Sequence, residues 1–205
     1  RCGFFATAWE ASDKISNEKN IVTWNALMSG LSDHGLGGEA LKCLEQMQCE
    51  GIVGNSVTFV CGMKACGSIR ARDKGKAIHA WIDSLGLSGR KDIIVGNALI
   101  GMYSKCGLLE FAQAVFDKLQ ARDVVSWTAL IDGYTEYGQG ASAIKCYEQM
   151  RLENVTPNSI TFVCGLKACG SIGITDKGIK IHSEIERKGC LPETNIVLGN
   201  ALLDM

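Results

Sequence analysis

The sequence has very little proline, no excess of charge of either sign and no long apolar run. Only two prolines occur in 205 residues, so few positions interrupt helical hydrogen bonding. The longest uncharged stretches, such as residues 51–63, are much shorter than the roughly 20 apolar residues of a membrane-spanning helix, and we expect no membrane insertion. With 21 basic and 22 acidic residues, the chain has no general electrostatic attraction to nucleic acid.

The sequence also lacks the patterns of a catalytic or metal centre. Its three histidines are not accompanied by Cys-x-x-Cys or His-x-x-x-His spacing. No nucleophile elbow and no phosphate-binding loop is present either. We therefore expect no catalytic residue, no metal and no cofactor, and we expect His79 and His182 to pack on helices.

An internal repeat organises the chain. Residues 57–69 return as residues 160–172 with 11 of 13 positions identical, at an offset of 103 residues. Trp24 and Trp127 are related by the same offset. Within this period lie three unequal repeats of 35, 37 and 31 residues. The predicted repeats are 21–55, 56–92, 93–123, 124–158 and 159–195, with partial short repeats at 1–20 and 196–205. A chain that begins and ends within a repeat is expected to be a piece of a longer array.

Ten cysteines are present, and eight of them follow the repeat. The equivalent pairs are Cys2 and Cys106, Cys43 and Cys146, Cys61 and Cys164, and Cys66 and Cys169, whereas Cys49 and Cys190 have no counterpart. A cysteine that recurs with a structural period is most simply a small buried apolar residue. Reduced cysteines suit the cytosol, the nucleus or an organelle interior better than secretion.

Each repeat contains two amphipathic segments separated by a breaker. The expected helices span 22–34 and 39–50 in the first repeat, 57–66 and 73–85 in the second, and 97–104 and 108–119 in the third. Glycine-containing turns are expected at 35–38 and 67–69. Stacked hairpins of this kind bury a continuous core. The sequence therefore predicts an all-α fold, a right-handed superhelical α-solenoid of helix-turn-helix repeats with the first helices lining a concave face.

These repeats resemble those of a known family. Residues 22–30, with Glu39-Ala40-Leu41 and Glu45-Gln46-Met47, are similar to the 35-residue pentatricopeptide repeat. The segment 75–79 resembles the long variant of that repeat, and the segment 96–107 resembles the short variant. The order standard, long, short is similar to the PLS subclass, which is common in plant organelles.

The resemblance implies that one repeat faces one nucleotide of single-stranded RNA. In the family, the fifth and last residues of a repeat hydrogen-bond the base edge, and the second residue packs against the base. The base-reading residues carried over are Asn25, Asn55, Asn97, Asp123, Thr128, Asn158 and Asn200. The base-sandwiching residues are Val22, Ile94, Val125 and Val197, with Val57 and Ile160 in the long repeats. Asparagine can both donate and accept, whereas Val and Ile are stiff and apolar.

The family's pairing rules imply a base for each complete pair. Asn25 with Asn55 favours a pyrimidine, leaning to C; Asn97 with Asp123 favours U; and Thr128 with Asn158 favours A. The long repeats depart from the pattern, because Val60 and Val163 at their fifth positions cannot hydrogen-bond a base.

Other interpretations stay open from the sequence alone. Asn25, Asn97 and Asn200 have an alternative role in lining the groove or capping neighbouring turns. Trp24 and Trp127 occupy a periodic apolar position, and we expect them in the core and not against bases.

The leading functional hypothesis is sequence-selective RNA binding in a chloroplast or mitochondrial factor for RNA processing, editing, stability or translation. One rival is a scaffold that binds other proteins of a large organellar assembly. Another is the targeting arm of an editing enzyme, whose deaminase-like zinc domain would lie outside this chain.

The order of the repeats predicts an RNA motif that selection can test. Read in parallel from 5′ to 3′, the motif is pyrimidine, any base, U, A, any base, pyrimidine. Selection of random RNA on the whole chain is expected to enrich U followed by A, because two complete reading pairs occupy consecutive repeats. Recovered pools in which this dinucleotide is no commoner than in the starting pool would contradict the prediction.

Overall fold

The computed structural model describes residues 20–87 and 92–187, and all regular structure within these ranges is α-helical. The predicted sites Val197 and Asn200 lie outside the described residues, as do Cys2 and Cys190. The chain forms two compact units, Arg1–Leu87 and Ser88–Met205. We call them the N-terminal unit and the C-terminal unit.

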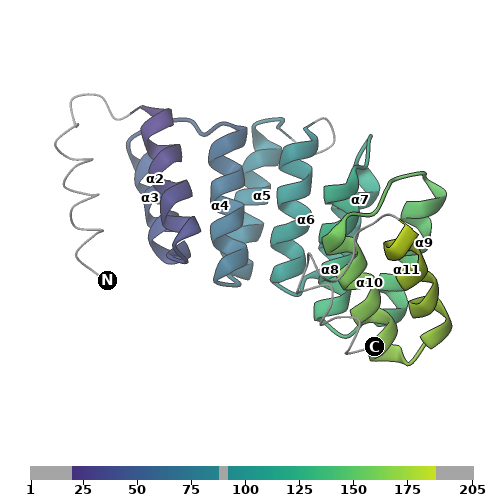
Figure 1. Cartoon of the computed structure of the whole chain (residues 1–205). Helices are drawn as coiled ribbons and strands as arrows, with labels where there is room; N and C mark the ends of the chain where they lie inside the picture. The colour runs from purple at the N-terminus through teal and green to yellow at the C-terminus, as the bar shows by residue number, and fades with distance from the viewer. Residues whose placement is uncertain (1–19, 88–91, 188–205) are drawn as a thin grey trace. The chain divides into compact units, whose positions relative to one another are not determined.

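Both units consist of helical hairpins (Figure 1). The N-terminal unit contains α2 (Ile21–Asp33), α3 (Gly37–Cys49), α4 (Ser56–Ser68) and α5 (Arg72–Ser84). The C-terminal unit contains α6 (Ile93–Lys105), α7 (Leu109–Lys118), α8 (Val124–Glu136), α9 (Gly140–Leu152), α10 (Ser159–Ile172) and α11 (Thr175–Arg187). Each of α8 to α11 begins 103 residues after its counterpart among α2 to α5, so the helices follow the sequence period.

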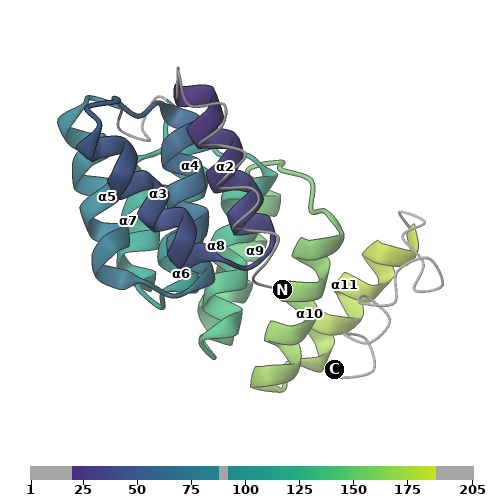
Figure 2. The same ribbon diagram turned by 90° about the vertical axis from the view of Figure 1, so that its left-hand side faces the viewer.

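The first helices of successive hairpins lie side by side. In the N-terminal unit α2 packs against α4, as Figure 2 shows. In the C-terminal unit α8 packs against both α6 and α10. The second helices cover one side of these rows: α3 contacts α2 and α4, and α9 contacts α8 and α10. The predicted all-α fold of stacked hairpins is therefore confirmed, and the opposite side of each row of first helices faces outward.

Two of the predicted turns are wrong in extent. The helix α3 begins at Gly37, so only residues 34–36 separate it from α2. The helix α4 continues through Gly67 to Ser68, where a turn was expected. Both glycines are helical and buried. Gly37 approaches α4 closely, so at that position glycine serves close packing instead of chain reversal.

The core contains the residues that the periodicity assigns to it. Trp24 and Trp127 are each 2% exposed, which confirms the prediction that they pack inside. The Trp127 ring meets the Phe116 ring edge to face, with centroids 4.5 Å apart. His79 and His182 pack only partly, with 23% and 40% of their side-chain areas exposed.

The cysteines within the described ranges are free thiols. The repeat-paired ones are buried, apart from the half-buried Cys146, while the unpaired Cys49 is exposed. Burial, aided by the carboxylate of Asp132, raises the pKa of Cys164 to about 12. Burial similarly raises the pKa of Cys146 to about 11. These thiols stay protonated at neutral pH and act as apolar packing groups.

The described residues contain neither a metal-binding cluster nor a membrane-spanning helix. No three His, Cys, Asp or Glu side chains are grouped so that they could hold a metal ion. No helix in this part of the chain has the length and apolar character needed to cross a membrane.

The helices α3 and α4 lie so close together at Gly37 that one added methyl group there would clash with α4. A Cβ added at Gly37 would lie 2.8 Å from the Ala65 carbonyl oxygen and 2.9 Å from a methyl carbon of Ile69. In the C-terminal unit, Gly140 approaches the carbonyl of Ala168 in the same way, at 2.9 Å. The backbone oxygens cannot move without shifting a helix.

Gly37→Ala is therefore expected to lower the free energy of unfolding by about 1–3 kcal/mol through overpacking. The matched control is Gly38→Ala, because a Cβ at Gly38 has nothing within 4 Å and that residue is exposed. The control is expected to be neutral or to stabilise the helix by up to about 1 kcal/mol. Urea unfolding followed by circular dichroism measures both, and equal effects of the two substitutions would rule out the close contact.

Candidate nucleic-acid interface

The outward face of the first helices carries an exposed β-branched residue at the second position of each helix. Val22, Val57, Ile94, Val125 and Ile160 are between 52% and 70% exposed. Their recurrence at one helical position distinguishes them from scattered surface apolar residues. Within each unit, the described residues predicted to sandwich bases therefore lie on the outward side of the first helices, which we call the first-helix face of that unit.

The last residue of each predicted repeat has a structural role that the sequence analysis missed. Five first helices begin with an N-cap side chain that accepts hydrogen bonds from the backbone of the first turn. These N-caps are Asn20, Asn55, Asp92, Asp123 and Asn158. The second helices α3, α5, α7 and α9 have no such side-chain cap. The cap thus anchors the start of the first helices specifically.

Capping determines which polar atoms of an asparagine remain available. The Oδ1 atoms of Asn55 and Asn158 accept the backbone N–H groups of Thr58 and Thr161, at 3.0 and 2.9 Å. Only the oxygen of a carboxamide can accept these hydrogens. The amide nitrogen of each asparagine must therefore point away from the helix end. Both asparagines are exposed, so they present N–H donors at the first-helix face.

In two repeats the structure brings the predicted base-reading residues into direct contact. The Asn25 Nδ2 atom donates to Asn55 Oδ1 at 3.2 Å. The Asn97 Nδ2 atom donates to Asp123 Oδ1 at 3.1 Å. Asn25 is only 9% exposed, so its hydrogen bond also belongs to the α2–α4 contact. The alternative role of these asparagines in lining and capping is therefore compatible with base reading.

The third pair meets through an intermediate residue. Thr128 Oγ1 lies 2.7 Å from Thr161 Oγ1, and Thr161 Oγ1 lies 2.9 Å from Asn158 Oδ1. Thr161 is fully buried, and Thr128 is 8% exposed. A hydroxyl at the third position of the next first helix thus connects the fifth residue of one repeat to its last residue.

These third-position hydroxyls were not among the site residues predicted from the sequence. Thr58, Ser126 and Thr161 each accept the N-cap backbone N–H while the N-cap side chain accepts theirs. Their signal is the spacing Asn/Asp-x-x-Ser/Thr before an apolar helix, a variant of the capping box. This spacing was present in the sequence and marks the start of α2, α4, α8 and α10, whereas α6 has Val95 at the third position.

The carboxylate of Asp123 is ionised at neutral pH. Partial burial alone would raise its pKa, but hydrogen bonds from the backbone and hydroxyl of Ser126, from Asn97 and from the Val125 backbone lower the pKa below its ordinary value. Asp123 is therefore only an acceptor. It contrasts with the asparagine caps, which present donors.

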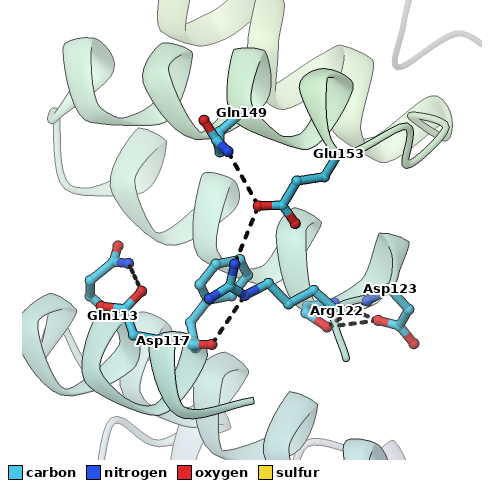
Figure 3. A network of polar contacts seen from close by, with 8 residues as sticks. Gln113, Asp117, Arg122, Asp123, Gln149 and Glu153 are labelled. Carbon is cyan, nitrogen blue, oxygen red and sulfur yellow. Dashed lines mark hydrogen bonds and ion pairs between the residues drawn. The ribbon is translucent and has the colours of Figure 1, made fainter. Parts of the chain in front are cut away.

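The neighbouring Arg122 fixes the segment that carries Asp123. Figure 3 shows its guanidinium between the end of α7 and the end of α9. It lies 4.7 Å from the Phe116 ring centroid, its Nε donates to the Phe116 carbonyl at 3.4 Å, and its Nη1 donates to Glu153 at 3.3 Å. Stacking and two hydrogen bonds hold the backbone immediately before the N-cap.

Charges on the first-helix face offer little net attraction to phosphate. Lys64 of α4 forms an ion pair with Asp33 of α2, and its ammonium group lowers the pKa of that carboxyl. On α8 the exposed residues Asp132 and Glu136 are acidic. The long-repeat residues Val60 and Val163 contribute no polar atom, as expected from the sequence. Any nucleic-acid affinity must come mainly from base contacts.

The capping role predicts how stability responds to substitution of Asn55. Asn55→Ala removes the acceptor for the Thr58 N–H and is expected to lower the free energy of unfolding by about 1 kcal/mol. Asn55→Asp retains the acceptor and is expected to be nearly neutral. Gln139→Ala is the control, since Gln139 precedes α9 without a side-chain cap. Thermal unfolding in which Asn55→Ala and Gln139→Ala behave alike would contradict the cap.

Comparisons with known proteins agree with these features. A model described as the PPR repeat family matches residues 19–68 and 122–171, and one described as PPR repeat matches residues 97–124. The two ranges of the first model are themselves one 103-residue period apart.

Similar full-length sequences occur in Arabidopsis thaliana. A chloroplastic pentatricopeptide repeat-containing protein is 34% identical over 205 residues, covering 100% of this chain and 32% of that protein. A mitochondrial one is 33% identical over 172 residues, covering 84% of this chain and 25% of that protein. The chain therefore spans less than a third of the length of either relative.

Among solved structures, the chain resembles the pentatricopeptide repeat protein PPR10, crystallised in complex with an 18-nt psaJ RNA element. The TM-score is 0.71 at 16% sequence identity, over 96% of this chain and 28% of that one. This likeness establishes the fold, an α-solenoid of helical hairpins.

Proposed function

Because the chain belongs to the pentatricopeptide repeat family, we propose that it binds single-stranded RNA and reads it with one base per hairpin. The observation that carries the proposal is the meeting of fifth and last residues at the first-helix face. The contact between Asn25 and Asn55 and that between Asn97 and Asp123 each lie between successive first helices. An exposed β-branched residue on the same face, such as Val22 or Ile94, offers each base an apolar surface. The PPR10 complex supports RNA as the ligand.

The proposed repeats follow the PLS order. Successive N-caps at Asn20, Asn55, Asp92, Asp123 and Asn158 are 35, 37, 31 and 35 residues apart. This spacing supports repeats 21–55, 56–92, 93–123 and 124–158, with 159–195 following. The proposed partial repeats 1–20 and 196–205 flank these repeats.

The chemistry of the last residue supports the proposed choice between bases. Cytosine and adenine place an acceptor, N3 or N1, at the middle of the Watson–Crick edge, whereas uracil and guanine place an N–H donor there. The outward amide N–H of Asn55 suits the acceptor N3 of cytosine. The carboxylate of Asp123 suits the N3–H of uracil, and its lowered pKa keeps it an acceptor.

The size of the fifth residue supports a second distinction. Asn25 and Asn97 extend further from their helices than Thr128, so they leave room for the smaller pyrimidine ring. The shorter Thr128 leaves room for a purine, and the outward amide of Asn158 suits the N1 acceptor of adenine. These assignments are C for Asn25 with Asn55, U for Asn97 with Asp123, and A for Thr128 with Asn158.

We place the whole protein in a chloroplast or mitochondrion, as a factor in RNA processing, editing, stability or translation. The chloroplastic and mitochondrial names of its relatives support this location. We propose that the chain itself binds without catalysing a reaction, because its repeats account for all the polar groups that the site uses. In an editing factor it would be the targeting arm.

A second candidate function is a scaffold for other proteins of an organellar assembly. The observation that favours it is the charge of the first-helix face, where Lys64 is paired with Asp33 and α8 exposes Asp132 and Glu136. A scaffold and a reader differ in one measurable property: only a reader changes its preferred base when its reading residues are exchanged.

The exchange of one reading pair tests this distinction. Asn25→Thr together with Asn55→Asp is expected to shift the preferred base at that position from a pyrimidine to G, by roughly 1–3 kcal/mol. The donor becomes an acceptor, and the longer side chain becomes the shorter one. Affinities for RNAs that differ only at that base provide the measurement.

The matched control is Asn55→Asp alone, which changes the donor to an acceptor without changing the size of the fifth residue. This variant is expected to move the preference from C to U. If neither variant alters the order of affinities among the four bases, RNA reading by this pair is excluded and the scaffold is favoured.

A further inference from the structure

We propose that Thr161 is a specificity-determining positioning residue. Its buried hydroxyl makes Thr128 a hydrogen-bond acceptor, and Thr128 then selects adenine over guanine. The inference rests on the proposed RNA-reading function and adds a third residue to the reading pair. Thr161 touches no base in this scheme. It acts through Thr128 and Asn158.

The Thr161 hydroxyl has three polar contacts but only one hydrogen. Its Oγ1 accepts the backbone N–H of Asn158 at 3.2 Å, lies 2.9 Å from Asn158 Oδ1 and lies 2.7 Å from Thr128 Oγ1. A hydroxyl has one hydrogen and two lone pairs. The amide oxygen of Asn158 has no hydrogen, so the 2.9 Å contact is a hydrogen bond only if Thr161 donates in it.

The donation by Thr161 fixes the hydrogen of Thr128. Because Thr161 gives its only hydrogen to Asn158, the 2.7 Å contact between the two threonines is a hydrogen bond only if Thr128 donates. The opposite arrangement makes only one of these two hydrogen bonds, in a site where Thr161 is fully buried. The arrangement in which both contacts are hydrogen bonds is therefore favoured.

Thr128 and Asn158 together set the pattern presented to a base. Thr128 has used its hydrogen inside the protein and has only a lone pair to offer. Asn158 has its oxygen turned toward the helix and offers N–H. This acceptor and donor complement the N6–H and N1 of adenine. Guanine places an acceptor, O6, and a donor, N1–H, at the same positions and is rejected at both.

The equivalent residue of the N-terminal unit shows that the hydroxyl responds to its neighbours. Thr58 Oγ1 lies 2.7 Å from Asn25 Oδ1 and 3.1 Å from Asn55 Oδ1, and because both amide oxygens can only accept, its single hydrogen goes to the nearer one, on Asn25. There the hydroxyl turns the oxygen of the fifth residue inward. The third-position hydroxyl thus orients the fifth residue in both pairs. Thr58 donates to Asn25, whereas Thr161 accepts from Thr128.

The pair Asn97 and Asp123 provides a natural control. Ser126 occupies the third position, but its hydroxyl donates to Asp123 Oδ1 at 2.8 Å. The buried Asn97 Oδ1 has no hydrogen-bond partner within the described part of the chain. The carboxylate of Asp123 is a hydrogen-bond acceptor with or without the Ser126 hydroxyl. Removal of the Ser126 hydroxyl should therefore weaken the cap without altering which base is read.

The experiment measures affinities of the whole chain for RNAs of the motif pyrimidine-any-U-A-any-pyrimidine and for the same RNAs with G in place of A. The wild-type protein is expected to prefer A by about tenfold, a typical effect of one mismatched base. Thr161→Val keeps the shape and removes the hydroxyl, which frees Thr128 to donate or accept. The A-to-G ratio should then fall from about ten to about three, because Asn158 still opposes the N1–H of guanine, while Thr161→Ser should restore the wild-type ratio.

Ser126→Ala is the matched variant, since it removes an equivalent capping hydroxyl. It is expected to leave the A-to-G ratio unchanged and to retain U at the preceding position. Circular dichroism checks that each variant is folded; if Thr161→Val is not, Thr161→Ala, which introduces no second methyl, replaces it. A folded variant without the hydroxyl that still prefers A by the wild-type ratio overturns the inference while RNA reading stands. A wild-type chain with no preference at either the U or the A position overturns the proposed function itself.

Discussion

The hydrogen bond between an Asn or Asp side chain and the first turn of each first helix is the interaction on which the rest of the structure depends. It defines where α2, α4, α6, α8 and α10 begin, and hence which face each of these helices turns outward. Successive residues of a helix differ by about 100° around its axis, so the second and fifth residues after each cap lie at the same angular positions in every first helix. The exposed β-branched residues and the fifth residues therefore recur in one arrangement from repeat to repeat.

The same bond links stability to recognition. An N-cap must present an oxygen to the backbone, so an asparagine cap has only its nitrogen left for a ligand, and an aspartate cap has only acceptor atoms. The choice between Asn and Asp therefore costs the helix little while it reverses the chemistry offered to a base. Asn and Asp both cap the helix, so neighbouring repeats such as those ending at Asp123 and Asn158 share one architecture. They differ in the base that we assign to them because the two side chains offer different hydrogen-bonding groups.

Much of the architecture was predictable because it depends on local patterns. The 103-residue period, the two helices of each repeat and the burial of Trp24 and Trp127 all follow from the spacing of apolar residues. The errors have a common physical origin. Gly37 and Gly67 were interpreted as breakers, although each is a buried residue within a helix, and glycine alone does not distinguish a turn from a buried helical position.

The sequence by itself determined the repeat and the two helices within it, because these depend on neighbours within a few positions along the chain. Only the tertiary structure decided which polar side chains meet. Asn25 and Asn55 are 30 residues apart, and Thr128 and Thr161 are 33 apart, yet each pair is joined across adjacent first helices. Whether such groups touch directly or through a buried hydroxyl depends on differences of an ångström in helix packing. The periodicity of the sequence contains no information on that scale.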